Sequence, residues 1–278
     1  MKVGVLGAGV MGQGIAQTFA QTEGYSVVLA DLTVELAQKG KDKIVGGLLK
    51  RVEKGKLDQA VCDKIANNIS VGTKNDLKDV DLVVEAAIEN MKIKKDTFKE
   101  LESIVKEDTI FATNTSSLSI TEIGNGLSRP VIGMHFFNPA PVMKLVEVIG
   151  GLNTPRELID RIIKISEEIG KTPVEVNESA GFVVNRILIP MINEAIGVLA
   201  DGVASVEGID TAMKLGANHP IGPLELGDLI GLDVCLAIME VLFSETGDAK
   251  YRPHPLLRKM VRGNKLGRKV GQGFYNYK

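Results

Sequence analysis

The sequence predicts an α/β protein in which a doubly wound sheet domain precedes an all-helical domain, and three observations support this. Short apolar runs, each too short for a helix, alternate with helical segments through about residue 180. A glycine-rich turn joins the first of these runs to the first helix. Beyond residue 181 the apolar residues recur at helical spacing. We therefore expect a sheet domain over residues 1–180, with a helical hairpin inserted near 34–67, and a helical domain over 181–278.

The glycine-rich turn has the spacing of a phosphate-binding loop. A short apolar run over residues 3–6 is followed by Gly7, Gly9 and Gly12 in the pattern G-x-G-x-x-G, and a helical segment continues from Ile15. The first glycine permits the tight turn out of the strand, and the second lets backbone N–H groups approach a pyrophosphate. The third lets the helix pack close to the sheet, with its N-terminus aimed at the phosphates.

An acidic residue stands where such a loop needs one. The second predicted strand covers Tyr25–Ala30 and is followed by Asp31, about 20 positions after the glycines. There a carboxylate can accept hydrogen bonds from both ribose hydroxyls of NAD, and it would repel a 2′-phosphate. The two signals together predict a Rossmann-type domain that binds NAD. The alternative is a glycine-rich turn in some other α/β domain.

Composition restricts the class of protein. The chain has 278 residues, 44% of them hydrophobic and 24% charged, with a net charge of −2, so nothing global points to nucleic acid or an anionic membrane. No apolar stretch approaches the roughly 20 residues of a membrane span. Because the first predicted strand starts almost at once, we expect no signal peptide. Cys62 and Cys235 lie far apart and suggest neither a disulfide framework nor a metal site. We expect a cytoplasmic protein.

Residues 34–67 form a predicted helical hairpin that is rich in lysine. Apolar residues recur at helical spacing, with breaks expected at Gly46-Gly47 and at Gly55. The lysines include Lys50 and Lys54, and acidic residues are interspersed among them. Spacing alone leaves two interpretations, a solvated helix face or a docking site for a polyanionic ligand tail.

Polar residues follow the ends of three further predicted strands, over 81–85, 109–113 and 131–134. Ligands bind beyond the carboxyl ends of the strands in a parallel sheet. The segments at these ends are Ala86–Glu89, Asn114–Leu118 and His135–Pro139. A histidine at such an edge is a candidate catalytic group.

A strand predicted over Met143–Ile149 carries Glu147 between Val146 and Val148. A carboxylate in apolar surroundings is costly unless it is hydrogen-bonded or paired, and His135 is its natural partner. The alternative is an edge-strand glutamate that faces water.

The remaining chain is mainly helical. A helix is predicted over Pro155–Ile169 and a last short strand over Thr172–Val176. Helices are then predicted from Gly181 and over Leu224–Phe243. These stretches are too apolar for a small bundle exposed on all sides, which predicts a subunit interface.

Eight short motifs occur in one order along the whole chain. They are Gly7-Ala-Gly-Val-Met-Gly12, Val84-Glu-Ala-Ala-Ile-Glu89, Asn114-Thr-Ser-Ser-Leu118, His135-Phe-Phe-Asn-Pro139, Lys144-Leu-Val-Glu-Val148, Gly181-Phe-Val-Val-Asn-Arg186, Asn218-His-Pro-Ile-Gly-Pro223 and Gly271-Gln-Gly-Phe-Tyr275. With these motifs the chain resembles the 3-hydroxyacyl-CoA dehydrogenase family, particularly the short bacterial 3-hydroxybutyryl-CoA dehydrogenases. The resemblance implies reversible NAD-linked oxidation of (S)-3-hydroxybutyryl-CoA to acetoacetyl-CoA in fatty-acid and butanoate metabolism. The apolar helices after Gly181 separately predict a homodimer.

The resemblance also implies residue roles. The family's catalytic histidine and its glutamate partner fall on His135 and Glu147, and its active-site asparagine on Asn185. Its serine falls on Ser116, with Ser117 as the alternative because the loop that follows is shorter than usual. The residues implied to contact NAD are Gly7, Ala8, Gly9, Val10, Met11, Gly12, Asp31, Glu89, Lys94, Asn114, Asn138 and Lys269. The acyl-CoA substrate is implied to contact Ser116, Asn185, Lys50 and Lys54, although Leu48-Leu49 stands where the family often has a serine.

The implied mechanism is acid–base catalysis at the substrate's 3-hydroxyl. His135 accepts the hydroxyl proton, Glu147 orients the imidazole, and Ser116 and Asn185 hydrogen-bond the reacting oxygen. A rival interpretation is a dinucleotide-binding protein without turnover, a sensor or a structural subunit. An intact pair of His135 and Glu147 argues against it, since a pure binder needs no general base.

Overall fold

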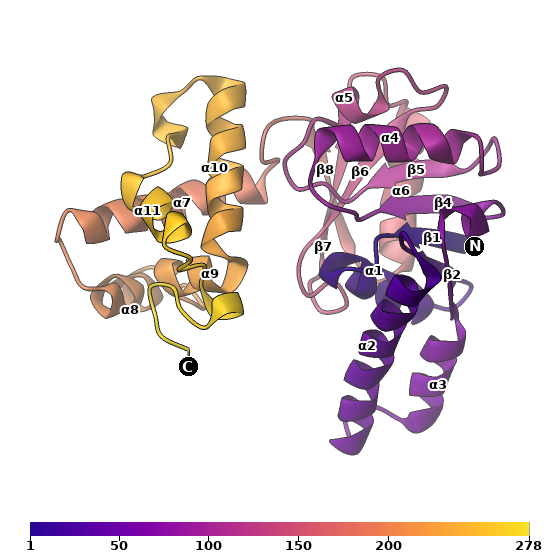
Figure 1. Cartoon of the computed structure of the whole chain (residues 1–278), viewed down its shortest axis with the longest axis horizontal. Coiled ribbons are helices and arrows are strands. Elements are labelled where there is room, and N and C mark those ends of the chain that lie inside the picture. The colour runs from indigo at the N-terminus through magenta and orange to yellow at the C-terminus, as the bar shows by residue number, and fades with distance from the viewer. Residues whose placement is uncertain (278) are drawn as a thin grey trace. The chain divides into compact units, whose positions relative to one another are not determined.

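A computed structural model describes residues 1–277 of the chain. The chain divides into two compact units, Met1–Glu178 and a second unit that begins at Ser179 (Figure 1). The first unit contains every strand of the described residues, and the second is built of helices. Among the described residues, no helix combines the length and the apolar character that crossing a membrane requires.

The first unit is built on one eight-stranded sheet with the strand order β3-β2-β1-β4-β5-β6-β7-β8. The strands are β1 (Lys2–Leu6), β2 (Ser26–Ala30), β3 (Ile69–Gly72), β4 (Leu82–Glu85), β5 (Ile110–Thr113), β6 (Val131–Phe136), β7 (Leu145–Gly150) and β8 (Thr172–Asn177). Neighbouring strands are parallel from β3 to β6, so the carboxyl ends of β1, β4, β5 and β6 lie at one edge. This is the doubly wound, Rossmann-type sheet that the sequence predicts.

Two features of the sheet differ from the sequence prediction. β7 runs antiparallel to β6, and β8 is parallel to β7, so the sheet is not parallel throughout. The reason is the connection between β6 and β7, which at about eight residues is too short for the crossover that parallel strands require. The short strand β3 was not predicted, because Ile69–Gly72 offers only four residues and alternates polar with apolar.

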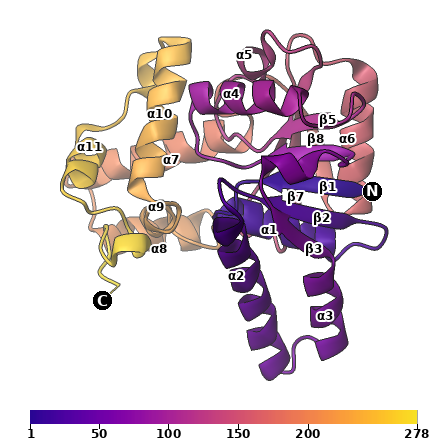
Figure 2. The same cartoon turned by 45° about the vertical axis from the view of Figure 1, so that its right-hand side comes forward.

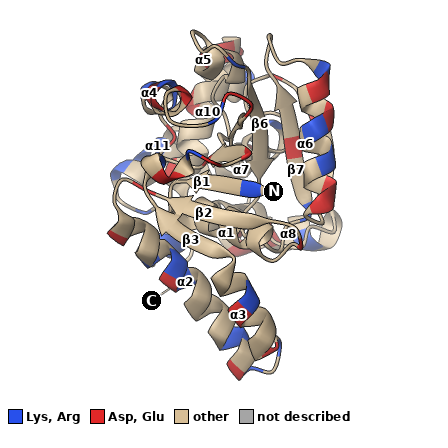
Figure 3. Cartoon of the chain, turned by 90° about the vertical axis from the view of Figure 1, so that its right-hand side faces the viewer, with Lys and Arg blue, Asp and Glu red and all other residues tan. Residues whose placement is uncertain are grey.

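The helices of the first unit cover the sheet and add one projection. They are α1 (Val10–Ala20), α2 (Val34–Glu53), α3 (Gln59–Asn67), α4 (Met91–Glu102), α5 (Ile120–Gly124), α6 (Arg156–Glu168) and the short 3₁₀ turn η1 (Lys74–Leu77). α2 and α3 extend away from the sheet as a pair (Figure 2). α6 buries Ile162 and Ile165 against the sheet and carries charges of both signs on its outer face (Figure 3).

The expected break at Gly46-Gly47 is wrong, because α2 runs through both glycines to Glu53. Ile44 and Leu48 are buried on either side of them, and tertiary packing of that face keeps the helix intact despite the poor helix propensity of glycine. The turn is made at Gly55, which has a positive φ of +64°. One lysine of the hairpin is structural, since Lys41 Nζ donates to the Ile69 carbonyl at 2.6 Å.

The second unit packs its helices around one apolar core. They are α7 (Val184–Ala200), α8 (Val206–Gly216), α9 (Pro223–Ile230), α10 (Leu232–Thr246) and α11 (Pro255–Arg262), with 3₁₀ turns η2 (Ala249–Tyr251) and η3 (Arg268–Val270). The single helix predicted over Leu224–Phe243 is wrong. Gly231 has a φ of +105°, which ends α9 and starts α10 in a new direction.

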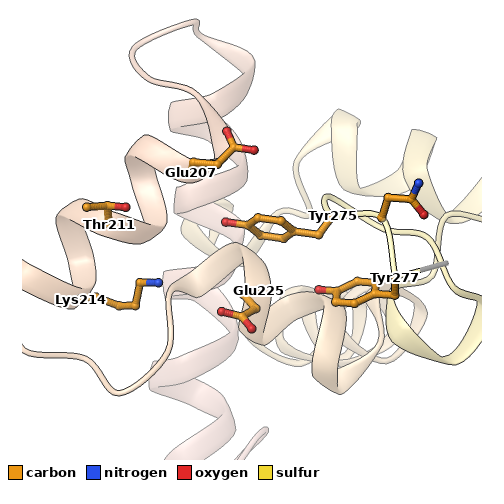
Figure 4. A pocket seen from close by; sticks show the side chains of 7 residues that line it. Glu207, Thr211, Lys214, Glu225, Tyr275 and Tyr277 are labelled. Atoms are coloured by element: carbon orange, nitrogen blue, oxygen red, sulfur yellow. The ribbon is translucent and has the colours of Figure 1, made fainter.

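Two buried carboxylates fix the C-terminal segment to the second unit. Asp228 accepts hydrogen bonds from the backbone N–H groups of Phe274 and Tyr275, each at 2.9 Å, and Asp210 accepts one from the Tyr275 hydroxyl at 2.8 Å. Tyr275 lines a pocket of about 350 Å³ between α8, the start of α9 and this segment (Figure 4). Burial raises the pKa of Asp228, and the hydrogen bonds from the tail oppose that rise.

Candidate active site

The glycine-rich turn closes tightly around its own backbone. Gly7 has a φ of +106°, and its N–H donates to the Ala30 carbonyl at 2.8 Å. A Cβ at Gly12 would lie 1.7 Å from the Gly7 carbonyl oxygen, so only glycine lets α1 approach the turn this closely. A Cβ at Gly9 would meet no protein atom within 4 Å. The turn is therefore closed on the protein side and open at Gly9, beside the N-terminus of α1.

Asp31 is tied to the same turn. Its Oδ2 accepts a hydrogen bond from the Ala8 N–H at 2.6 Å, and its Oδ1 accepts one from the Leu32 N–H at 2.7 Å. The carboxylate is partly exposed at the end of β2. An open space over Gly9, a helix N-terminus and a carboxylate beside them fit the pyrophosphate and ribose of a dinucleotide. The loop residues Val10 and Met11 form the first turn of α1, and Val10 is exposed.

His135 and Glu147 form a buried pair at the carboxyl edge of the sheet. They are register partners on β6 and β7, so the antiparallel strand places both side chains on one face. His135 Nδ1 lies 2.7 Å from Glu147 Oε2, and the two side chains are 7% and 1% exposed. The Phe137 ring stands 4.5 Å from the imidazole between ring centres. The contact that the sequence predicts is present, and the alternative of a solvent-facing Glu147 is wrong.

The loop after His135 is held in place by two polar side chains. Asn114 Oδ1 accepts a hydrogen bond from the Phe136 N–H at 2.8 Å, which fastens the end of β6 to β5. Lys171, buried near β8, donates to the carbonyls of Ala140 and Met143 at 2.5 and 2.8 Å. Burial lowers the pKa of Lys171. These contacts position Asn138, which is itself exposed in the loop.

Glu89 accepts hydrogen bonds from both candidate serines. Its Oε1 accepts hydrogen bonds from the Thr115 hydroxyl at 2.7 Å and from the Ser116 N–H and hydroxyl at 2.8 and 3.1 Å. The Ser117 hydroxyl lies 3.4 Å from the same oxygen. Ser116 is therefore the more tightly held of the two serines, and Ser117 is the more buried. The geometry brings both serines to one carboxylate.

A buried ion pair between Lys94 and Glu85 lies beside Glu89. Lys94 is 1% exposed and donates to Glu85 Oε1 and Oε2 at 2.8 and 2.9 Å, and its Nζ lies 3.4 Å from Glu89 Oε2. Burial alone would raise the pKa of Glu89, but the Lys94 charge and the hydrogen bonds from Thr115 and Ser116 hold that pKa below its usual value. Glu89 is thus ionised at neutral pH.

Sequence reasoning missed Glu85, Thr113 and Thr115 as members of this site. Glu85 is the last residue of β4 and is fully buried. A glutamate directly after three apolar strand residues was the available signal, because a buried carboxylate requires partners. Those partners come from other elements, which periodicity does not reveal.

Four predicted site residues lie apart from this cluster along the chain. Lys50 lies in the last turn of α2, and Lys54 is its C-terminal cap, at the tip of the hairpin. Asn185 lies in the first turn of α7 in the second unit. Lys269 is in η3 of that unit, and its Nζ donates to Asp233 Oδ2 at 2.6 Å. Their roles at the site stay predictions. Among residues 1–277, no group of three or more His, Cys, Asp or Glu side chains is arranged to hold a metal ion.

Comparison with known proteins gives a consistent result. Residues 2–179 match the family model described as 3-hydroxyacyl-CoA dehydrogenase, NAD binding domain, and residues 181–277 match the C-terminal domain of the same family. The chain is 59% identical to a 3-hydroxybutyryl-CoA dehydrogenase of Clostridioides difficile, over 100% of this chain and 99% of the relative. It is 44% identical to the mitochondrial hydroxyacyl-coenzyme A dehydrogenase of Homo sapiens, over 99% and 91%. The crystal structure of (S)-3-hydroxybutyryl-CoA dehydrogenase from Ralstonia eutropha superposes with a TM-score of 0.94 at 50% identity, covering 100% of this chain and 99% of that one.

The fold, the glycine turn and the buried imidazole–carboxylate pair at the sheet edge together define an NAD-dependent oxidoreductase. The two family models cover nearly the whole chain. The chain belongs to the 3-hydroxyacyl-CoA dehydrogenase family.

Proposed function

We propose that the protein catalyses the reversible oxidation of (S)-3-hydroxybutyryl-CoA to acetoacetyl-CoA. The observation that carries this proposal is the buried pair of His135 and Glu147, 2.7 Å apart. The pair lies at the carboxyl edge of the sheet, where dinucleotides bind in folds of this kind. The similarity to enzymes named for this substrate supports it. When bound, NAD supplies the hydride acceptor, and NADH the hydride donor.

His135 is the proposed general base in the oxidising direction and the general acid in the reducing direction. Glu147 occupies the Nδ1 side of the ring, so Nε2 is the nitrogen that exchanges the proton of the 3-hydroxyl. A buried carboxylate at that distance orients the ring and stabilises the imidazolium once it forms. Ser116, held by Glu89, and Asn185 are proposed to hydrogen-bond the reacting oxygen as its charge changes.

The coenzyme A portion of the substrate is proposed to bind at the tip of the α2–α3 hairpin. Lys50 and Lys54 are exposed there, and their side chains are not buried against the sheet. An exposed pair of ammonium groups suits the phosphates of the adenosine end. Replacing both by Ala is expected to raise the KM for acetoacetyl-CoA, whereas the KM for NADH stays unchanged.

Steady-state oxidation of NADH with acetoacetyl-CoA, followed at 340 nm, tests the function directly. The proposal expects saturable turnover and formation of (S)-3-hydroxybutyryl-CoA. NADH binding without turnover would instead support the rival interpretation, a dinucleotide-binding protein that serves as a sensor or structural subunit. If turnover is found, a panel of longer 3-oxoacyl-CoA thioesters gives the chain-length preference.

A homodimer in the cytoplasm is the proposed state of the protein. The second unit exposes large apolar side chains at Ile187, Leu215 and Leu229, which are 69%, 83% and 52% exposed. Both cysteines are buried free thiols, as expected in a reducing compartment. Light scattering at micromolar concentration tests the dimer. A mass near 29.9 kDa would show a monomer.

A further inference from the structure

Glu85, at the carboxyl edge of the sheet, is fully buried and makes four polar contacts. Its Oε1 accepts from the Ala87 N–H at 2.7 Å and from Lys94 at 2.8 Å. Its Oε2 accepts from the Thr113 hydroxyl at 2.7 Å and from Lys94 at 2.9 Å. One carboxylate thus joins the end of β4, the end of β5, the loop after β4 and helix α4.

The contacts continue from Glu85 toward the serines in an order of alternating charge. The buried Lys94 ammonium lies between the Glu85 carboxylate and Glu89 Oε2, which is 3.4 Å away. The other oxygen of Glu89 accepts from the backbone N–H and the hydroxyl of Ser116. Glu89 is therefore the single residue between Lys94 and Ser116, and a shift of Lys94 would move Ser116 through it.

Stability alone is a poor reason for this arrangement. A buried ion pair often stabilises a fold no more than well-packed apolar residues of the same size would. It does fix where its charges stand, because each charge is held by several hydrogen bonds in a medium of low dielectric constant. Glu85 has four such contacts. Lys94 donates to both oxygens of Glu85, so one of its three N–H groups remains for a further carboxylate.

We propose that Glu85 is a positioning residue for the reaction, acting through Lys94 and Glu89 to fix the serine that hydrogen-bonds the reacting oxygen. Its kinetic consequence rests on the function proposed above, and its structural consequence does not. Without the Glu85 charge, Lys94 has Glu89 as its remaining carboxylate partner in the cluster. Lys94 then shifts toward Glu89 and draws Glu89 from the backbone of Ser116.

Glu85→Gln is the direct test, because the side chain keeps its shape and loses its charge. The matched control is Tyr25→Phe, which removes a partly buried hydrogen bond to Glu168 beside the opposite, amino-terminal edge of the sheet. Hydrogen–deuterium exchange of the peptide over residues 114–118 reports the Ser116 N–H without any substrate. Turnover of acetoacetyl-CoA at saturating NADH reports the reaction.

We expect the peptide over 114–118 to exchange at least about three-fold faster in Glu85→Gln than in Tyr25→Phe. We expect kcat and kcat/KM to fall together by about ten-fold, less than the 10²–10³-fold typical for removing a direct donor. Equal exchange in the two variants would overturn the proposal, and so would faster exchange with kcat within two-fold of the wild type.

A wild type without turnover would refute the proposed function. The exchange result would still decide whether Glu85 positions the backbone of Ser116. If Glu85→Gln does not fold, Thr113→Val removes one hydrogen bond to Glu85 Oε2 at constant shape. It is expected to give the same two changes at about two- to three-fold. An unchanged exchange rate and an unchanged kcat in that variant would overturn the proposal.

Discussion

His135 on β6 and Glu147 on β7 are direct register partners of an antiparallel strand pair, with 2.7 Å between the imidazole Nδ1 and the carboxylate Oε2. The pairing of two neighbouring strands thus sets the distance between the proposed base and its partner. Neither side chain depends on a mobile loop for its position. The pair is consequently preorganised, so the imidazole needs no rearrangement before it accepts a proton.

His135→Gln is expected to lower kcat by about 10²–10⁴-fold, the range for losing a general acid–base, while NADH still binds. Turnover and NADH fluorescence titration measure the two effects separately. His254→Gln is the control, because His254 caps α11 through a hydrogen bond from the Leu256 N–H at 3.1 Å. Activity of His135→Gln within a few-fold of the wild type would remove the histidine from the mechanism.

Glu147→Gln is expected to lower kcat by about 10²-fold or more, since a neutral amide orients the ring but cannot stabilise the imidazolium. The pH dependence of kcat should change with it. Glu175→Gln serves as the control, because Glu175 lies on β8 in an exposed ion pair with Arg156. A variant at position 147 with the wild-type rate and pH profile would contradict the assigned role.

Gly9→Ala and Gly12→Ala are expected to fail in different ways. The Cβ at position 12 would lie 1.7 Å from the Gly7 carbonyl oxygen, so that variant should lose stability or not fold. The Cβ at position 9 meets no protein atom within 4 Å, so that variant should fold normally. It should bind NADH about ten-fold more weakly, because the methyl group takes the space of the pyrophosphate. Thermal unfolding and NADH titration check both, and wild-type NADH affinity in Gly9→Ala would place the pyrophosphate elsewhere.

NADH is expected to be preferred over NADPH by about ten-fold or more in kcat/KM, which is roughly 1.4 kcal/mol. The Asp31 carboxylate accepts from the Ala8 N–H and stands beside the loop, where it would repel a 2′-phosphate. Asp31→Ala should reduce the preference and also weaken NADH binding. Glu35→Gln, in the first turn of α2, is the control. Equal use of both cofactors by the wild type would show that Asp31 does not select between them.

The stability that Glu89 contributes is expected to depend on pH. Its pKa in the folded protein is lower than the usual value of about 4.3, so the folded state binds fewer protons than the unfolded state just below that value. The contribution is complete above about pH 5 and is lost as the pH falls through the lowered pKa. The difference in unfolding free energy between the wild type and Glu89→Gln should therefore shrink below about pH 4. Urea unfolding measures it, with the exposed Glu23→Gln as control, and a difference that grows on acidification would contradict the assignment.

The local sequence determined the parts of the site that lie within single strand–turn units. The spacing of Gly7, Gly9 and Gly12 and the place of Asp31 predicted the dinucleotide loop, because each requirement is met by the backbone near that residue. The apolar neighbours of Glu147 showed that this carboxylate needs a partner. The roles of Asn185 and Lys269 came only through resemblance to the family. For Lys50 the lysine-rich hairpin left a solvated helix face and a ligand-docking site as alternatives, and the resemblance favoured the docking site.

The tertiary structure decided what depends on contacts between segments far apart along the chain. The reversal of β7 made Glu147 the register partner of His135, and Gly231 split one predicted helix into two. Tertiary packing of its apolar face, at Ile44 and Leu48, carried α2 through Gly46-Gly47 despite the poor helix propensity of glycine. Above all, Glu85, Lys94 and Thr113 meet only in the folded chain, because the ends of β4 and β5 and helix α4 come together at one edge. Hydrophobic periodicity specifies which face of an element is buried, and it does not specify which polar side chains meet there.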